Sequence, residues 1–225
     1  FFHPEDGIRD PLWSRGLGDV YKRQPYNIYQ TYERLEKAGY DMAVHMDLMD
    51  GHFVPRLGVH PESLDEINYL KPKQKVSNTM IDAHAMITWN NPAWGDIINS
   101  RRPRKIFVHY ESFPNEELLI QFLHTNGRFK LAFKPWHTVK QMHTICERMY
   151  VDEFLLMTYA PGNKGATAGY DLDQLQDTDK YVTVDGGVTL DTVQRFRENP
   201  NVNLVCGSKV IFNENYEENM KCLTS

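Results

Sequence analysis

A histidine and an aspartate separated by one residue, His45 and Asp47, are side chains that could bind a metal ion or transfer protons. Residues 40–48 around them are largely apolar and contain neither Gly nor Pro, a pattern that predicts a β-strand. Side chains on a strand alternate between two faces, so His45, Asp47 and Met49 point the same way. An imidazole and a carboxylate on one face form half of a divalent-metal site. The alternative is a half-buried strand in which His45 and Asp47 pair only with each other.

A second segment repeats this arrangement. Residues 76–86 predict another strand, in which Asp82, His84 and Met86 share one face. A third candidate, Asp185, ends an apolar strand farther along the chain. These residues can meet only if their three strands lie around one opening.

Helices and strands alternate along most of the chain, which implies a parallel sheet with right-handed crossovers. Seven strands with one more before them would form a (β/α)8 barrel, the TIM barrel, in which chemistry occurs at the carboxyl ends of the strands. His45, His84 and Asp185 lie at such ends. The predicted strands are 40–48, 76–86, 105–110, 129–133, 154–158, 181–185 and 202–206, and the predicted helices are 29–38, 61–70, 91–100, 115–125, 138–150, 190–198 and 214–222.

Five ordered motifs resemble one known family. Residues 45–55 read His-x-Asp-x-Met-Asp-Gly-x-Phe-Val-Pro, which is similar to the signature of the ribulose-phosphate 3-epimerase family. Four later segments resemble the same family in the same order, from about residue 30 to the C-terminus. They are Asp-Ala-His-Ala-Met at 82–86, Met-Thr-Tyr-Ala-Pro-Gly at 157–162, Val-Asp-Gly-Gly-Val at 184–188 and Gly-Ser at 207–208.

The resemblance implies a metal site. It assigns the ligand roles to His45, Asp47, His84 and Asp185. Two imidazoles and two carboxylates suit Zn²⁺, Fe²⁺, Mn²⁺ or Co²⁺, and they leave positions for substrate oxygens. We therefore expect one divalent ion as the cofactor. His109, at the end of the third predicted strand, either lines this pocket or supports it structurally.

The resemblance also implies an isomerase, a 3-epimerase that interconverts D-ribulose 5-phosphate and D-xylulose 5-phosphate in the pentose phosphate pathway. Inverting a carbon beside a ketone removes a proton from one face and returns one to the other, so two acid–base groups are needed. The family pattern gives these roles to Asp47 and Asp185, with an enediolate between the two transfers and a divalent ion stabilising it. Met49 and Met86 correspond to the family's apolar lid over the enediolate, or are ordinary core methionines.

Small residues in the loops after the last three strands predict a phosphate-binding site. Backbone N–H groups of these loops commonly bind phosphate in barrels, and glycine allows the close approach. Lys164 and Arg56 stand where the family commonly has other residues, and Lys164 either pairs with an acidic group such as phosphate or is solvent-exposed. The candidate phosphate-binding residues are Gly162, Gly165, Gly186, Gly187, Gly207 and Ser208.

Two other functions fit the same residues. An epimerase of a hexulose phosphate such as allulose 6-phosphate would share the whole pattern, because the departures bear on the sugar more than on the reaction. A non-catalytic sugar-phosphate binder descended from such an enzyme would have no need of the complete set of two histidines and two aspartates.

The composition of the chain suits one soluble domain. Its 225 residues are 41% hydrophobic and 24% charged. A net charge of −5 gives no basic surface for nucleic acid or an anionic membrane, and no apolar run approaches the ~18 residues of a membrane span. Three widely spaced cysteines predict reduced thiols in a cytoplasmic protein. The expected partner is a small-molecule ketose phosphate, and homo-oligomerisation is left open.

Residues 1–24 need separate treatment because they have neither helical nor strand periodicity. They lack the charged and apolar regions of a signal peptide, and they resemble translated sequencing adapter. The alternative is a natural disordered extension. The remaining residues, 25–225, begin with the first predicted helix, at 29–38, and no predicted strand precedes it, so we expect a single barrel domain that lacks its first strand.

Overall fold

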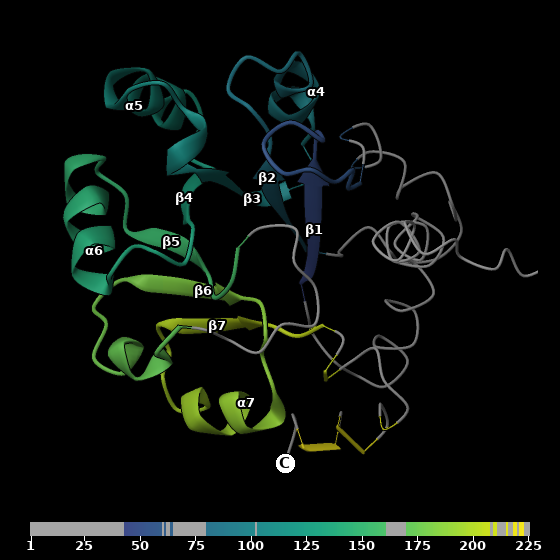
Figure 1. Ribbon diagram of the computed structural model, residues 1–225, viewed down its shortest axis with the longest axis vertical. Helices are drawn as coiled ribbons and strands as arrows, with labels where there is room; N and C mark the ends of the chain where they lie inside the picture. Colours follow the sequence, from purple (N-terminus) through teal and green to yellow (C-terminus); the bar gives the residue numbers. More distant parts are fainter. Residues whose placement is uncertain are drawn as a thin grey trace, which may run out of the picture.

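Seven parallel β-strands form the framework of the computed structural model (Figure 1). The order of the strands in the sheet, β1 to β7, is their order along the chain. The strands are β1 Val44–Met49, β2 Ile81–Met86, β3 Pro103–His109, β4 Phe129–Phe133, β5 Glu153–Met157, β6 Tyr181–Asp185 and β7 Val202–Val205. The structure describes residues 43–59, 61, 64, 80–101, 103–160, 170–207, 209, 210, 215, 218, 219, 221 and 222.

The sheet curves into an incomplete barrel with helices on its outer side (Figure 1). All seven predicted strands are confirmed, with ends that differ by a few residues. Four of the predicted helices are confirmed, and two short 3-10 helices were not predicted. The helices are α4 Trp94–Asn99, η3 Tyr110–Ser112, α5 Glu116–His124, α6 Val139–Arg148, η4 Leu172–Leu175 and α7 Leu190–Phe196.

Several predictions fall outside the described residues. The leader at 1–24 and the helix at 29–38 lie there entirely, and most of the helices at 61–70 and 214–222 do as well. None of the helices in the part of the chain that the structure describes is long and apolar enough to cross a membrane.

Helices α5, α6 and α7 begin where polar side chains replace the missing backbone bonds of the first turn. The Asn115 side chain accepts a hydrogen bond from the Leu118 N–H and caps α5. At α6, Thr138 and Gln141 form a capping box, in which each side chain bonds the other residue's backbone. These caps set where each helix starts, and thereby how long the loop from the preceding strand is.

The alternation of side chains along each strand divides the core into two parts. Outward-facing residues such as Met46, Ala83 and Ile106 are buried between the sheet and the helices. Inward-facing residues build a smaller cluster inside the barrel: Phe107, Ala132, Leu155 and Met157. The inner cluster makes the barrel interior a packed core beneath the carboxyl ends of the strands.

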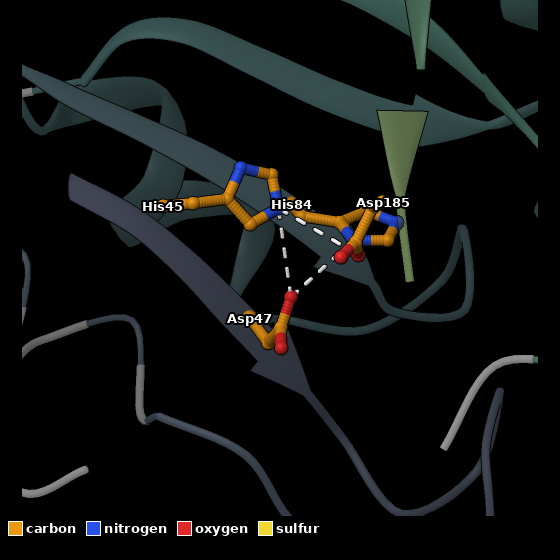
Figure 2. A group of neighbouring side chains, drawn as sticks. All are labelled: His45, Asp47, His84 and Asp185. Carbon is orange, nitrogen blue, oxygen red and sulfur yellow. Dashed lines mark ion pairs between the residues drawn. The ribbon is translucent and has the colours of Figure 1, made fainter. Parts of the chain in front are cut away.

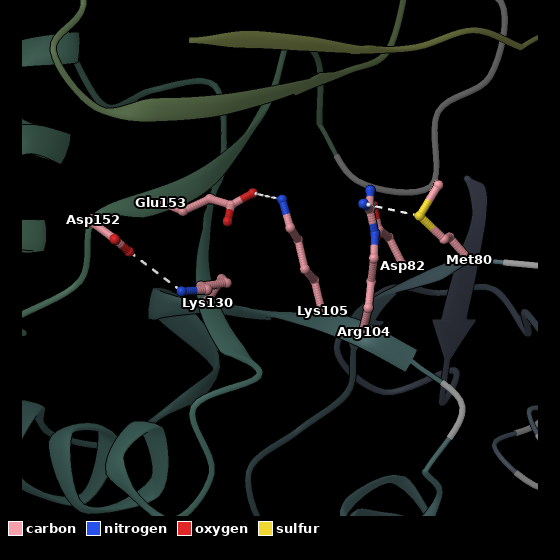
Figure 3. Close-up of polar contacts among 7 residues, drawn as sticks. All are labelled: Met80, Asp82, Arg104, Lys105, Lys130, Asp152 and Glu153. Carbon is pink, nitrogen blue, oxygen red and sulfur yellow. Dashed lines mark hydrogen bonds and ion pairs between the residues drawn. The ribbon is translucent and has the colours of Figure 1, made fainter. Parts of the chain in front are cut away.

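Charged side chains close the opposite, amino end of the strands (Figure 3). Arg104 binds both carboxylate oxygens of Asp82, through Nε at 2.7 Å and Nη2 at 2.9 Å. Lys105 pairs with Glu153 across the barrel, from β3 to β5. Asp82 is thus paired with Arg104 at the amino end of the strands. Of the two polar residues on the inner face of β2, Asp82 and His84, only His84 points to the carboxyl end.

Candidate metal centre

Three strands bring the four predicted ligand residues to one place at the carboxyl end of the sheet (Figure 2). Strands β1 and β2 pair in parallel, and Asp47 lies directly beside His84 in their register. His45 precedes Asp47 by two residues on the same face, and Asp185 is the last residue of β6. Their candidate ligand atoms all lie within 4.8 Å of one another. The predicted cluster of two histidines and two aspartates is therefore present.

His84 lies at the centre of this cluster. Its Nδ1 is 3.4 Å from Asp47 Oδ1 and 3.4 Å from Asp185 Oδ2. His45 Nε2 lies 3.6 Å from the same oxygen of Asp47 and 3.9 Å from the same oxygen of Asp185. Two nitrogens and two oxygens thus surround one small space and come from strands β1, β2 and β6.

The nitrogens that face this space are buried. The His84 side chain has 0% exposure and that of His45 has 13%. Within the described residues, His45 Nε2 and His84 Nδ1 have no hydrogen-bond partner. A buried polar atom without a partner is costly, and a cation among these lone pairs would remove that cost. Two imidazole and two carboxylate donors fit Zn²⁺, Fe²⁺, Mn²⁺ or Co²⁺, so these residues could hold a metal ion.

The two histidines respond differently to their surroundings. Burial alone would lower the pKa of His84, but the carboxylates of Asp185 and Asp47 beside Nδ1 outweigh it and raise the pKa to about 9. At His45 burial prevails over the attraction of Asp185 and Asp47, and the pKa is lowered. Without a metal, a proton at His84 is therefore the positive charge that the two carboxylates hold.

The predicted methionines lie next to the cluster. Met49 and Met86 are partners in the register of β1 and β2, one step beyond Asp47 and His84 on the same face. Met86 is buried and Met49 is half-buried. Their role as a lid over substrate stays a prediction.

The predicted phosphate-binding residues are only partly described. Gly162, Gly165 and Ser208 lie outside the described residues. Gly186 and Gly187 follow β6 with φ of +106° and +64°, so the chain turns sharply just after Asp185. Gly207 follows β7, and a Cβ added there would meet no atom within 4 Å. Their binding of phosphate remains a prediction.

The loop after β1 is built around Asp50. The carboxylate of Asp50 accepts hydrogen bonds from the backbone N–H groups of His52 and Phe53 in its own loop. Its other oxygen accepts from both the N–H and the hydroxyl of Thr88, beyond the end of β2, and from Asn91. Asp50 therefore ties together the ends of the two strands that carry His45, Asp47 and His84.

Two polar residues behind the cluster extend what the sequence indicated. His109, the last residue of β3, is fully buried and contacts His84 through a nitrogen–nitrogen distance of 2.9 Å. Of the two predicted roles for His109, the described contacts match structural support. Glu111 contacts the other nitrogen of His109 and was not predicted. The signal for it was the His-x-Glu spacing at the end of a predicted strand, the counterpart of His-x-Asp at His45.

The electrostatic state of this pair follows from its burial. Burial lowers the pKa of His109 to about 4, although the nearby Glu111 favours the charged form. Burial would raise the pKa of Glu111, but the contact with His109 and the Lys134 N–H lower it. His109 is therefore neutral and Glu111 ionised at neutral pH.

The fold and the cluster together define an α/β barrel protein with a candidate metal centre of two histidines and two aspartates. A family model described as the ribulose-phosphate 3-epimerase family matches residues 23–211. The chain therefore belongs to the ribulose-phosphate 3-epimerase family, as its motifs predict.

Curated relatives carry the same family name. The ribulose-phosphate 3-epimerase of Bacillus subtilis is 28% identical over 195 residues, which are 78% of this chain and 82% of that protein. The protein of the same name from Schizosaccharomyces pombe is 27% identical over 199 residues, 85% of this chain and 84% of that protein. The match to the Chlamydia pneumoniae protein of this name is 29% identical over 134 residues and spans 59% of this chain but only about half, 54%, of that relative.

Solved structures agree on the fold. KGPDC from Streptococcus mutans matches with a TM-score of 0.55 at 10% identity, covering 88% of this chain and 90% of that chain. Thiamine phosphate pyrophosphorylase from Pyrococcus furiosus matches with a TM-score of 0.51 at 10% identity, covering 88% and 87%. At this level of identity the likeness concerns the arrangement of strands and helices, and it supports the predicted (β/α)8 fold, of which the described residues supply seven strands.

Proposed function

We propose that this chain is a metal-dependent epimerase that inverts C3 of D-ribulose 5-phosphate to give D-xylulose 5-phosphate. The observation that carries the proposal is the convergence of two carboxylates from opposite parts of the sheet. Asp47 on β1 and Asp185 on β6 each place one oxygen 3.4 Å from the same buried nitrogen of His84. The printed names of the relatives support the choice of substrate.

The two aspartates divide the proton transfers between them. In one direction, the ionised carboxylate of Asp47 takes the proton from C3, the electron pair moves into the carbonyl, and an enediolate forms. Asp185, protonated at that moment, then returns a proton to the opposite face of C3, and the roles exchange in the reverse direction. Two groups are needed because one carboxylate cannot reach both faces of the same carbon.

The protein supplies a dry and charged setting for this transfer. A divalent ion held by His45, Asp47, His84 and Asp185 would act as a Lewis acid on the ketose oxygens and offset the negative charge that develops. The apolar side chains of Met49 and Met86 beside the carboxylates limit the access of water. The backbone at Gly186 and Gly187 after β6, and at Gly207 after β7, is the described part of the proposed phosphate site.

Exchange of the C3 proton with solvent tests this mechanism. We expect the chain with a divalent ion to incorporate deuterium at C3 of D-ribulose 5-phosphate in D₂O, measured by NMR. Asp47→Asn should lower the exchange rate by about 10²-fold or more, and both Asp47→Asn and Asp185→Asn should lower the conversion to D-xylulose 5-phosphate by about 10²-fold or more. Asp152→Asn, which removes an exposed carboxylate paired with Lys130, is the control and should exchange at the wild-type rate.

Metal content, measured on the same samples, separates a loss of ion binding from a loss of proton transfer. If both site variants exchange protons as fast as the wild type, the mechanism with two carboxylates is wrong.

The relative turnover of D-ribulose 5-phosphate and allulose 6-phosphate by the wild type decides between the pentulose and the hexulose as substrate. We expect the pentulose phosphate to be turned over faster.

A further inference from the structure

A chain of hydrogen bonds runs from the candidate metal centre into the protein behind it. His84 Nε2, the nitrogen that faces away from the two aspartates, lies 2.9 Å from His109 Nε2. The other nitrogen of His109, Nδ1, lies 3.2 Å from Glu111 Oε2. These three residues belong to β2, β3 and η3, so the chain also connects neighbouring elements of the barrel.

The chemistry of the three groups permits one direction for these hydrogen bonds. An ionised carboxylate can only accept, so the proton between Glu111 and His109 must be on His109 Nδ1. A neutral imidazole carries one proton, which leaves His109 Nε2 as an acceptor. His84 Nε2 must then be the donor, and the lone pair of a neutral His84 is at Nδ1, where Asp47 and Asp185 meet it.

The surroundings hold this chain in place. Glu111 Oε1 accepts a hydrogen bond from the Lys134 N–H at 3.1 Å, and His137 Nδ1 lies 3.3 Å from the same oxygen. The His109 ring is fully buried and packs against the Phe53 ring, with 4.8 Å between centroids. Glu111 thus has both oxygens engaged, and His109 has little room to turn.

We propose that Glu111 and His109 are positioning residues that fix the protonation pattern of the His84 ring, so that Nδ1 presents its lone pair to the metal. This inference rests on the proposed metal site. Neither residue is one of the four candidate ligands, and each acts through the next ring. Outer residues of this kind orient a ligating histidine and raise its basicity, and their loss typically weakens metal binding about 10- to 100-fold.

The positions of the ring protons can be observed directly. Long-range ¹H–¹⁵N correlation spectra of the 225-residue chain, with and without Zn²⁺, report which ring nitrogens carry protons. We expect a proton on His84 Nε2 and on His109 Nδ1, and none on His109 Nε2, in both states. A proton on His109 Nε2 would overturn the proposal, whether or not the chain binds zinc.

The effect on zinc affinity is tested by titrating zinc into the protein in a calorimeter. Glu111→Leu and His109→Phe should weaken zinc binding about 10- to 100-fold. Each substitution removes an acceptor from the chain of hydrogen bonds and puts an apolar side chain of similar size in its place. His109→Gln should recover much of the loss, because the amide oxygen of Gln reaches the place of Nε2 and can accept from His84.

Glu116→Gln is the matched control. Glu116 lies five residues beyond Glu111 in the same part of the chain and bonds Tyr110 and Arg148 instead of the histidines. This variant should bind zinc as the wild type does. Equal zinc affinity in the wild type, Glu111→Leu and His109→Phe would refute the positioning role. A wild-type chain that binds no zinc would instead refute the metal site, and the ring-proton pattern would still test the chain of hydrogen bonds.

Discussion

At the scale of single residues, Asp50 shows how a charged group can organise the chain around a site. Its carboxylate accepts hydrogen bonds from backbone N–H groups of two loops, those after β1 and β2. Partial burial opposes its ionisation, but the hydrogen bonds from Thr88, Phe53 and His52 prevail and lower the pKa from 3.8 to about 2. The ionised form of Asp50 is therefore more stable in the folded chain than in the unfolded one.

This shift predicts a pH-dependent contribution to stability. Because the folded pKa is depressed, the contribution is complete above pH 3.8 and is lost as the pH falls towards about 2. At neutral pH, Asp50→Asn should lower the free energy of unfolding by about 1 kcal/mol, because solvent screens the partly exposed carboxylate and reduces the energy that the pKa shift implies. Urea denaturation at pH values from 7 to about 2.5 measures the difference between the two proteins, which should shrink as the pH falls.

Asp177→Asn, at an exposed turn after η4, is the control and should show no such trend. A difference between wild type and Asp50→Asn that stays constant with pH would contradict the role of the Asp50 charge.

Residue patterns predicted the ligand cluster but could not predict what lies behind it. Alternation along a strand places His45, Asp47 and His84 on one inner face, and their pairing follows from parallel strands in register. The resemblance of their motifs to the family is what singled them out as ligands. The contact of His109 with His84 depends on ring orientation across two strands. Spacing along the chain carries no information about ring orientation.

At the scale of elements, the turn after β6 determines where Asp185 points. Gly186 has a φ of +106°, and a Cβ built there would lie 2.6 Å from the Tyr159 ring and 3.0 Å from Thr158 Oγ1. The Thr158 hydroxyl also donates to the Gly186 carbonyl at 2.7 Å. The chain just after β5 and the chain just after β6 are therefore in close contact next to Asp185.

Gly186→Ala should consequently disturb the site. The left-handed backbone and the clash together should cost about 1–3 kcal/mol of stability, and the shift of Asp185 should weaken zinc binding. Gly95→Ala is the matched control, because Gly95 is in α4 and an added Cβ would meet nothing within 4 Å. That variant should gain about 0.5–1 kcal/mol and bind zinc unchanged. Chemical denaturation and zinc titration measure both effects, and unaltered zinc binding by Gly186→Ala would contradict this account.

The elements were predictable to different degrees. Apolar runs bounded by turn residues gave all seven strands. The start of α4 was predicted too early because the Asn91 side chain accepts from the Ala93 N–H and forms a local turn before the helix. At the 3-10 helix η3, the Ser112 hydroxyl donates a hydrogen bond to the His109 carbonyl, a contact that residue periodicity does not reveal.

At the scale of the whole molecule, the candidate ligands come from strands that are far apart in the sheet order. His45 and Asp47 are on β1, whereas Asp185 is on β6. An ion that binds these residues binds only the folded chain, so it should stabilise the whole barrel by mass action.

Thermal unfolding tests this linkage. Zn²⁺ at about 100 times its dissociation constant should add about 2.7 kcal/mol to the free energy of unfolding. For a chain of this size, the melting temperature should rise by about 5–10 °C. The rise should vanish in Asp185→Asn and persist in His124→Gln, which alters an exposed histidine on α5. An equal rise in Asp185→Asn would mean that zinc binds elsewhere.

The strict agreement between strand order and chain order has one more consequence. A cut in the loop between α5 and β4 would yield two fragments, each holding an uninterrupted run of neighbouring strands. The first fragment would carry three of the four ligands, and the second would carry Asp185. Binding of an ion by the mixed fragments would therefore show that the two halves had reassembled. The metal centre could thus be used to measure fragment complementation.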